Sequence, residues 1–541
     1  MQPSDTASRK PWHGRASRAT IAAVLLASGA LAGLPPAYAI SPPTIDPAAV
    51  PPDGPPGPPA PMKQNSYCTE VGVLPGTDFR LPPKYMEMLN LQEAWQFGRG
   101  AGQKVAVIDT GVTPHPRFPH LIPGGDYIMG GDGLSDCDAH GTIVASMIGA
   151  APANGATAPP AAPPGPGGQA PASNHGGGTV TIPGYAGGGH VVAVDNPRPQ
   201  DPPPPPPGPA PAQAPDAYSG IAPDVDIISI RQDSQAFGLK DAYTGDEDPQ
   251  TRAKIDDVET MARAIVHAAN LGATVINISD ITCMSARNII DQRSLGAAVH
   301  YAAVDKNVVI VAAAGDTSKK DCKQNPAYDP MQPKDPRDWA GVTTVVTPSW
   351  FSDYVLTVGA VDTDGRPLTQ GGQGQGTTSV AGPWVGIAAP GTDVIGLSPR
   401  DDGLINAIDG PDNSLLVPSG TSFSTAIVSG VAALVRAKYP ELSAYQVINR
   451  LERTARAPAR GVDNQVGHGI IDPVAALTWD VPQGPVKPPQ QLSAPLNIPK
   501  PPPRRDMVPV WVAAGGLTGA LLIAGAVFGT TVLMKRSRKQ Q

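Results

Sequence analysis

The sequence lacks the short motifs of several large functional classes. It contains no Walker phosphate loop, no H-E-x-x-H zinc helix and no EF-hand calcium loop, and no acidic loop carries a convincing set of calcium ligands. Its four cysteines include no C-x-x-C pair, which gives little support to a zinc or redox site. We therefore expect neither a metal nor another cofactor.

The main body of the chain also has no long basic run. The sequence holds 40 Lys and Arg against 47 Asp and Glu, so its formal net charge is -7 at pH 7. Proteins that bind nucleic acid usually present a basic patch to the phosphate groups. We expect no nucleic acid among the partners.

Proline and glycine, by contrast, are abundant, with 66 and 60 residues, and they gather in three tracts. Residues 41–62, 151–217 and 481–506 cannot bury enough apolar surface to offset the entropy lost on ordering. The first and third are predicted to be linkers. The second interrupts the main body between a helix and a strand, which predicts a surface loop. It contains His175 and His190, but two isolated histidines in such a tract are typical of solvated side chains.

The two ends of the chain predict export and membrane anchoring. Four basic residues within the first 20, an apolar run at 21–34 and the small-residue site Ala37-Tyr38-Ala39 have the pattern of a secretory signal peptide. Residues 507–534 carry no charge and exceed the roughly 20 residues that a membrane helix needs. A basic cluster follows at 535–539, and such clusters stay in the cytoplasm, so the main body is expected outside it.

Export is compatible with disulfide bonds, which persist outside the cytoplasm. Four cysteines allow three pairings, and we favour Cys68 with Cys137 and Cys283 with Cys322 because each pair joins neighbours along the chain. The first bond would tie the N-terminal extension beside His140. The second would close the loop after a strand that ends near Gly315.

Between the low-complexity tracts, short apolar runs alternate with longer segments that have helical periodicity. This alternation predicts an α/β fold with a parallel sheet covered by helices on both faces. In such sheets the loops at the carboxyl ends of the strands build the site. The predicted strands are 104–108, 225–230, 274–278, 308–313 and 354–361, and the predicted helices are 140–148, 257–271, 295–305, 421–438 and 444–454.

Three segments carry residue types that suit nucleophilic catalysis. They are V-A-V-I-D-T-G-V with Asp109, H-G-T-I-V-A with His140 and G-T-S-F-S-T-A with Ser422. Each alone has a structural explanation, because D-T-G commonly forms a turn, H-G caps a helix and Ser is frequent at a helix start. Together they supply a hydroxyl nucleophile, an imidazole base and an orienting carboxylate, which predicts a serine hydrolase. A lipase or esterase of the α/β-hydrolase type would need G-x-S-x-G and the order Ser, acid, His, and neither is present.

The order Asp, His, Ser and the segment G-T-S-F-S-T-A-I-V-S-G-V-A-A-L resemble the subtilisin-like serine proteases, over about residues 85–480 without the insertion. The whole layout resembles the mycosins, membrane-anchored subtilases associated with type VII secretion, and its long tract after the His140 helix resembles their long-insertion subgroup. The resemblance implies these segments: signal peptide 1–39, N-terminal extension 40–90 wrapping the body, catalytic domain 91–480 with insertion 151–217, stalk 481–506, membrane helix 507–534 and cytoplasmic tail 535–541.

The resemblance further implies a subtilisin-like serine endopeptidase that acts on exported proteins in the cell envelope. Its body would lie on the periplasmic side of the inner membrane, associated with the type VII secretion membrane complex. A second function is open, that of a mainly structural component of this complex with slow or secondary proteolysis.

Two positions depart from the subtilase pattern. Subtilases usually have an oxyanion-hole Asn after A-A-G, and here Asp316 occupies that position. An ionised carboxylate would repel the oxyanion, whereas a protonated carboxyl group could donate a hydrogen bond to it. A Ser-Leu-Gly segment often forms the substrate edge, and here it is replaced by Asn277-Ile278-Ser279-Asp280-Ile281. Asn277 and Ser279 are expected either to contact substrate or to cap the end of a strand.

Overall fold

The computed structural model describes residues 40–153, 216–241, 248–326, 337–368, 379–410, 414–459, 461–489 and 508–537. The chain divides into two compact units, residues 1–493 and residues 494–541. The predicted signal peptide and most of the predicted insertion, with His175 and His190, lie outside the described residues.

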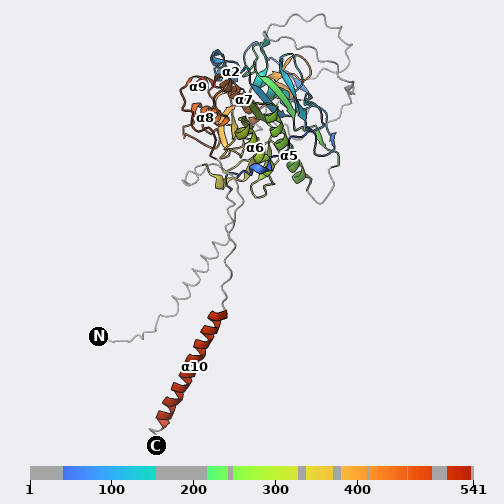
Figure 1. Cartoon of the computed structure of the whole chain (residues 1–541). Coiled ribbons are helices and arrows are strands. Elements are labelled where there is room, and N and C mark those ends of the chain that lie inside the picture. Colours follow the sequence, from blue (N-terminus) through green and yellow to red (C-terminus); the bar gives the residue numbers. More distant parts are fainter. Residues whose placement is uncertain are drawn as a thin grey trace, which may run out of the picture. The chain divides into compact units, whose positions relative to one another are not determined.

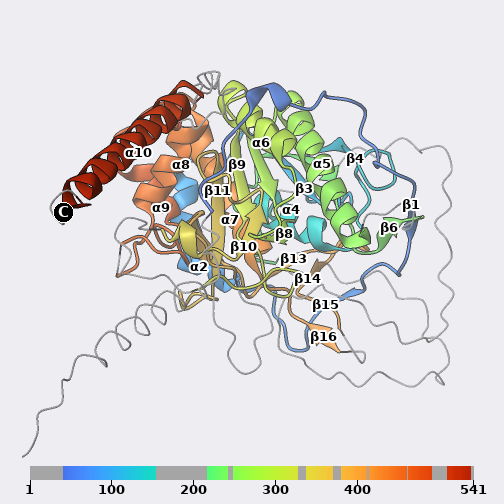
Figure 2. The ribbon, with the colours of Figure 1, turned by 90° about the horizontal axis from the view of Figure 1, so that it is seen from below.

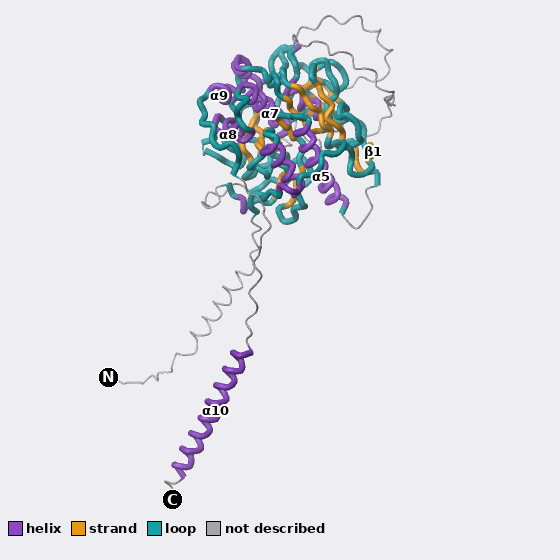
Figure 3. Tube along the Cα trace, in the orientation of Figure 1, coloured by secondary structure: helices purple, strands orange, loops and turns teal. Residues whose placement is uncertain are grey.

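A seven-stranded parallel sheet forms the centre of the first unit (Figure 1, Figure 3). All five predicted strands are present, and two further strands, β4 and β12, form its edges. In spatial order the strands are β12 (Val385–Pro390), β11 (Val355–Val361), β9 (Val309–Ala313), β7 (Val275–Ile278), β3 (Lys104–Asp109), β5 (Asp226–Arg231) and β4 (Leu121–Asp126).

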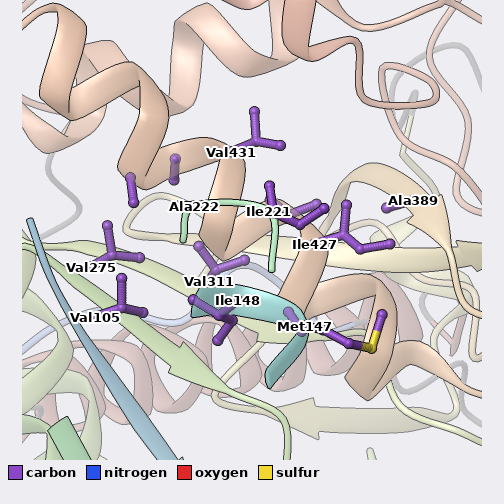
Figure 4. Close-up of a cluster of buried hydrophobic side chains, with 14 of the residues drawn as sticks. Val105, Met147, Ile148, Ile221, Ala222, Val275, Val311, Ala389, Ile427 and Val431 are labelled. Atoms are coloured by element: carbon purple, nitrogen blue, oxygen red, sulfur yellow. The ribbon is translucent and has the colours of Figure 1, made fainter. Parts of the chain in front are cut away.

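Both faces of the central strands are apolar, as a sheet covered on both sides requires. Along β3, Val105 and Val107 belong to one hydrophobic cluster, and Ala106 and Ile108 belong to the other. Successive side chains point to opposite faces of a strand, so this alternation places one cluster on each face of the sheet. Figure 4 shows part of the first cluster, where Val105, Val275 and Val311 of three strands lie with Ile427 and Val431 of a covering helix.

Helices cover the sheet as predicted. The helices α4 (His140–Gly149) and α7 (Thr421–Lys438) pack together on one face, with α8 (Ala444–Thr454) against α7. On the other face, α5 (Pro249–Asn270) and α6 (Arg293–His300) lie side by side (Figure 2). The largest differences from the predicted boundaries are in two of these helices. The helix α5 begins at Pro249, where the Asp248 side chain caps it, and α6 continues as a π-helical turn, η4 (Tyr301–Asp305).

Short elements surround this framework in the described part of the chain. The remaining helices and 3-10 turns are η1 (Pro47–Ala49), α2 (Lys84–Met88), α3 (Leu91–Ala94), η2 (Trp95–Phe97), η5 (Trp339–Gly341) and α9 (Pro473–Thr478). The remaining strands are β1 (Met62–Gln64), β2 (Val71–Gly72), β6 (Phe237–Leu239), β8 (Thr282–Ser285), β10 (Thr344–Thr347), β13 (Gly396–Leu397), β14 (Leu404–Ile405), β15 (Ala407–Asp409) and β16 (Leu415–Leu416).

The N-terminal segment contacts the main body at several points. Its first turn, η1, lies against α6 (Figure 2), β1 pairs with β6, and β2 pairs with β15. Both favoured disulfides are present, Cys68–Cys137 and Cys283–Cys322. The first of them bonds this segment covalently to the loop before α4.

The second unit contains α10 (Val508–Ser537). Within the described residues, its stretch Trp511–Arg536 is the one helical segment with the length and composition to cross a membrane.

Candidate active site

Asp109 is the last residue of β3 and is fully buried. Its Oδ1 accepts a hydrogen bond of 2.8 Å from the backbone N–H of Thr110. The chain then turns at Gly111, which has a φ of +99°, and a Cβ at this position would lie 2.3 Å from the carbonyl oxygen of Ser135. The glycine of the D-T-G segment is therefore required by the turn that follows the carboxylate.

His140 is the first residue of α4, and its Nδ1 lies 2.6 Å from Asp109 Oδ1. The next residue, Gly141, packs directly on the turn after Asp109, because a Cβ there would lie 2.0 Å from the Gly111 carbonyl oxygen. The H-G pair therefore lets α4 approach β3 closely enough for the imidazole to contact the carboxylate.

Ser422 is the second residue of α7 and is buried apart from a small exposed fraction. Two residues before it, the N-cap Gly420 has a φ of +143°, which is unfavourable for other residues. The ring of Phe423, the next residue, lies 5.4 Å from the His140 ring. The helices α4 and α7 also pack together. The structure thus brings the three predicted catalytic residues to the side of the sheet where the strands have their carboxyl ends.

The Ser422 hydroxyl donates a hydrogen bond of 3.1 Å to the carbonyl oxygen of Ser279. Asn277, by contrast, has no exposed surface, and its amide bonds the hydroxyls of Ser279 and Ser429. Ser279 is buried as well, with an exposed fraction of 1%. Substrate contact by either residue stays a prediction.

Asp316 follows β9 and lies against the start of α7. Its carboxylate accepts hydrogen bonds from the N–H of Thr421, at 3.1 Å to Oδ2, and from the Thr421 hydroxyl at 2.8 Å. Burial raises the pKa of Asp316 to about 6, while the bonds from Thr421 and the charge of His140 lower it. The carboxyl group is therefore close to Ser422, and its place in an oxyanion hole stays a prediction.

A buried ion pair, which the sequence did not predict, joins the two segments beside Ser422. Lys319 Nζ pairs with Asp280 Oδ1, and their side chains are 23% and 8% exposed. Burial lowers the pKa of Lys319 to about 8, whereas Asp109 and then Asp257 raise it. The disulfide Cys283–Cys322 links the same two segments a few residues further on.

The sequence analysis also missed Asp136, which lies behind the Asp109–His140 pair and accepts hydrogen bonds from Thr110 and Thr142. Burial raises the pKa of Asp136 to about 7, although the hydrogen bonds from Thr142 lower it. Its proximity to the H-G-T segment, four residues before His140, is a signal that could have found it.

These contacts define what the site can do. A buried carboxylate in hydrogen-bond contact with an imidazole fixes the orientation of the ring and stabilises its protonated form. A serine at the start of a helix has its hydroxyl near backbone N–H groups that favour negative charge. The arrangement suits attack by a serine on a carbonyl carbon.

Comparisons with known proteins agree with this chemistry. The family model described as "Subtilase family" matches residues 100–469. The chain is 70% identical to Mycosin-5 of Mycobacterium tuberculosis (strain ATCC 25618 / H37Rv), with all of both chains covered.

Two solved structures are also similar. One is a chain in "Structure of an intact ESX-5 inner membrane complex, Composite C3 model", with a TM-score of 0.69 and 73% identity, covering 91% of this chain and all of that chain. The other is "Crystal structure of MycP1 from the ESX-1 type VII secretion system", with a TM-score of 0.69 and 42% identity, covering 84% of this chain and all of that chain.

Proposed function

The chain belongs to the subtilase family of serine proteases, as a mycosin, and we propose that it hydrolyses peptide bonds in exported proteins through Asp109, His140 and Ser422. It is a serine endopeptidase. The observation that carries the assignment of residues is the 2.6 Å contact between His140 Nδ1 and Asp109 Oδ1, beside the helix start that holds Ser422.

Each residue has one role in the proposed mechanism. The Ser422 Oγ attacks the peptide carbonyl carbon while His140 accepts its proton, and the protonated imidazole then gives that proton to the leaving amine. Asp109 holds the other ring nitrogen and stabilises the imidazolium. Water releases the acyl group from Ser422 in a second cycle of the same proton transfers.

The oxyanion that forms during attack needs donors. The backbone N–H of Ser422, in the first turn of α7, is suited to supply one. The second donor of the family is an Asn side chain, and the neutral form of Asp316 would replace it here. Ionisation of Asp316 would remove this donor and add a repulsive charge, so we expect turnover to be slower than with Asn.

We propose that the catalytic body works on the periplasmic side of the inner membrane. The predicted signal peptide at residues 1–39, the apolar helix α10 and the basic residues at 535–539 support this placement. A similar chain is part of the intact ESX-5 inner membrane complex, and we propose that this protein joins a type VII secretion membrane complex in the same way. The predicted domain layout and the long-insertion subgroup remain part of this proposal.

A second function is favoured by the same similarity to a chain within a large complex. The protein would then act mainly as a structural component, with slow proteolysis, and the predicted insertion 151–217 and stalk 481–506 are the segments that we expect to contact the complex. Deletion of residues 155–215 tests this. Loss of the complex with retained catalytic activity supports docking, whereas increased activity with an intact complex contradicts it and indicates a shield over the cleft.

The enzymatic proposal is tested by labelling the membrane-derived full chain with a fluorophosphonate probe, with Ser422→Ala as the control. We expect labelling of the wild type and none of the variant. Equal labelling of both would overturn the assignment of Ser422, and no labelling of either would favour the structural function.

A further inference from the structure

The loop before α4 contains a carboxylate, that of Asp136, which contacts the residue after Asp109 and the second residue after His140. Asp136 Oδ1 accepts a hydrogen bond of 2.8 Å from the hydroxyl of Thr110. Its Oδ2 accepts bonds of 2.8 Å from the N–H of Thr142 and 2.7 Å from the Thr142 hydroxyl. One side chain thus connects the end of β3 to the first turn of α4.

The two threonines are placed to transmit this connection to the pair. Thr110 follows Asp109 and donates its N–H to Asp109 Oδ1 at 2.8 Å. The Thr110 hydroxyl also accepts a bond of 2.9 Å from the N–H of Gly141, the residue after His140. Displacement of Thr110 would therefore move the carboxylate and the start of the imidazole's helix together.

The start of α4 needs acceptors from elsewhere in the fold. The first N–H groups of a helix have no partner within it, and a polar side chain at the N-cap normally accepts one of them. Here the N-cap is Ala139, which provides no side-chain acceptor. Thr110 and Asp136 instead accept the N–H groups of Gly141 and Thr142, so the first turn is fixed by the segment that holds Asp109.

The backbone around Asp136 is itself held on two sides. The next residue, Cys137, is bonded to Cys68 of the N-terminal segment. Beyond it, the carboxylate of Asp138 accepts a hydrogen bond from the hydroxyl of Ser234 and another, of 3.0 Å, from the N–H of Gln235. The loop therefore presents the Asp136 carboxylate from a fixed position.

From these contacts we propose that Asp136 is a positioning residue, which sets the distance and orientation between Asp109 and His140. The inference rests on the proposed function, because it concerns the same catalytic pair. A merely structural cap would change the stability of the protein and leave the chemical step of the folded enzyme unaltered.

The test uses the full-length membrane protein and the kinetics of a fluorophosphonate probe, resolved into the probe affinity and the maximal rate of covalent modification. In Asp136→Asn an NH₂ group replaces one of the two oxygens that accept hydrogen bonds. This group would then face the donor groups of Thr110 or Thr142. We expect the maximal rate to fall on the order of 10- to 100-fold with little change in affinity, as small misplacements of catalytic groups do. The matched control is Asp132→Asn in the same loop, whose carboxylate is exposed and bonds the N–H of Leu134.

A second variant makes the test independent of folding effects. Thr142→Val removes one donor to Asp136 and also the acceptor of the Thr113 N–H. In a double-mutant cycle, the part of its effect on the maximal rate that depends on Asp136 should disappear in the Asp136→Asn background. The thermal midpoint of each variant is measured as well. A midpoint above the assay temperature shows that the rates of folded enzymes are being compared. Wild-type maximal rates in folded Asp136→Asn would overturn the inference, whereas absent or Ser422-independent labelling of the wild type would overturn the proposed function itself.

Discussion

Asp316 caps α7, the helix that carries Ser422. Its carboxylate accepts a hydrogen bond of 2.8 Å from the hydroxyl of Thr421 and one of 3.1 Å from the N–H of the same residue. The N-cap residue Gly420 has no side chain, and a Cβ in its place would lie 3.0 Å from Asp316 Oδ2. The departure from the subtilase Asn is therefore accommodated by a local contact. The carboxylate both fixes the start of α7 and stands beside the expected oxyanion.

The first prediction concerns Asp316→Asn. An Asn can keep its oxygen toward Thr421 and turn its amide toward the oxyanion. Because burial raises the pKa of Asp316 to about 6, the wild type loses its neutral donor as the pH rises through this value. The variant should therefore react faster than the wild type at pH 8, by roughly 10-fold or more, since one oxyanion-hole donor is worth about 100- to 1000-fold in subtilisin. The ratio of the two rates should shrink toward pH 5.

The measurement is the second-order rate constant of fluorophosphonate labelling from pH 5 to pH 8. An unchanged or lower rate in a folded Asp316→Asn variant at every pH would contradict the placement of Asp316 in the oxyanion hole.

The same pKa predicts a change in stability. The folded-state pKa of Asp316 is raised from 3.8 to about 6, so between these values the folded protein binds the proton more tightly than the unfolded chain. The contribution of this group to the free energy of unfolding thus falls as the pH rises through that window. Asp316→Asn should raise the thermal midpoint more at pH 7.5 than at pH 4. An equal change at both pH values would exclude ionisation of Asp316 as the cause.

The buried pair Lys319–Asp280 yields another prediction. Lys319→Met leaves the Asp280 carboxylate buried without its cation, and we expect a loss of about 3–5 kcal/mol in the free energy of unfolding. The double variant Lys319→Met with Asp280→Asn should recover most of this loss. The control is Arg293→Met, which breaks the exposed pair with Asp291 and should change the free energy of unfolding far less, because solvent screens exposed charges. Equal losses in the Lys319 single and double variants would show that the charge of Asp280 is not the cause.

The disulfide Cys283–Cys322 closes a sequence separation of 39 residues and joins the segments that follow Ser279 and Asp316. Replacing both cysteines by serine should lower the free energy of unfolding by about 2–4 kcal/mol, mainly because the unfolded chain gains freedom. Denaturant unfolding of the double variant measures this loss. A variant as stable as the wild type would mean that the bond contributes nothing to folding.

The sequence predicted the parts of the fold that depend on local pattern. Buried parallel strands are continuous apolar runs, which the five predicted strands are. The strand β4 was missed because Pro123, Gly124 and Gly125 interrupt its run, and such residues are tolerated at the sheet edge where it lies. The start of α5 was placed too late, although Asp248 followed by Pro249 is a typical helix start.

The residues of the candidate site also fall into those that the sequence predicted and those that it did not. Asp109, His140 and Ser422 were predictable because each lies in a short motif next to an apolar strand or helix. The pair Lys319–Asp280 was not, because the two residues lie in different segments of the chain and the sequence alone gives no distances. Asp136 lies four residues before His140, which is a signal, but its bond to Thr110 joins two segments that only the structure shows to be close. The role of Gly141 also becomes visible only with the backbone of Gly111 beside it.

The central claim is that Asp109, His140 and Ser422 act as one proton-transfer unit. The direct test is the fluorophosphonate rate constant of wild type, Asp109→Asn, His140→Ala and the double variant, with the modified residue located by mass spectrometry. We predict modification of Ser422, a loss on the order of 10⁴-fold or more in His140→Ala, and no further loss in the double variant, because Asp109 acts only through the imidazole. A double variant whose loss equals the product of the two single losses, or modification at another residue, would contradict the account.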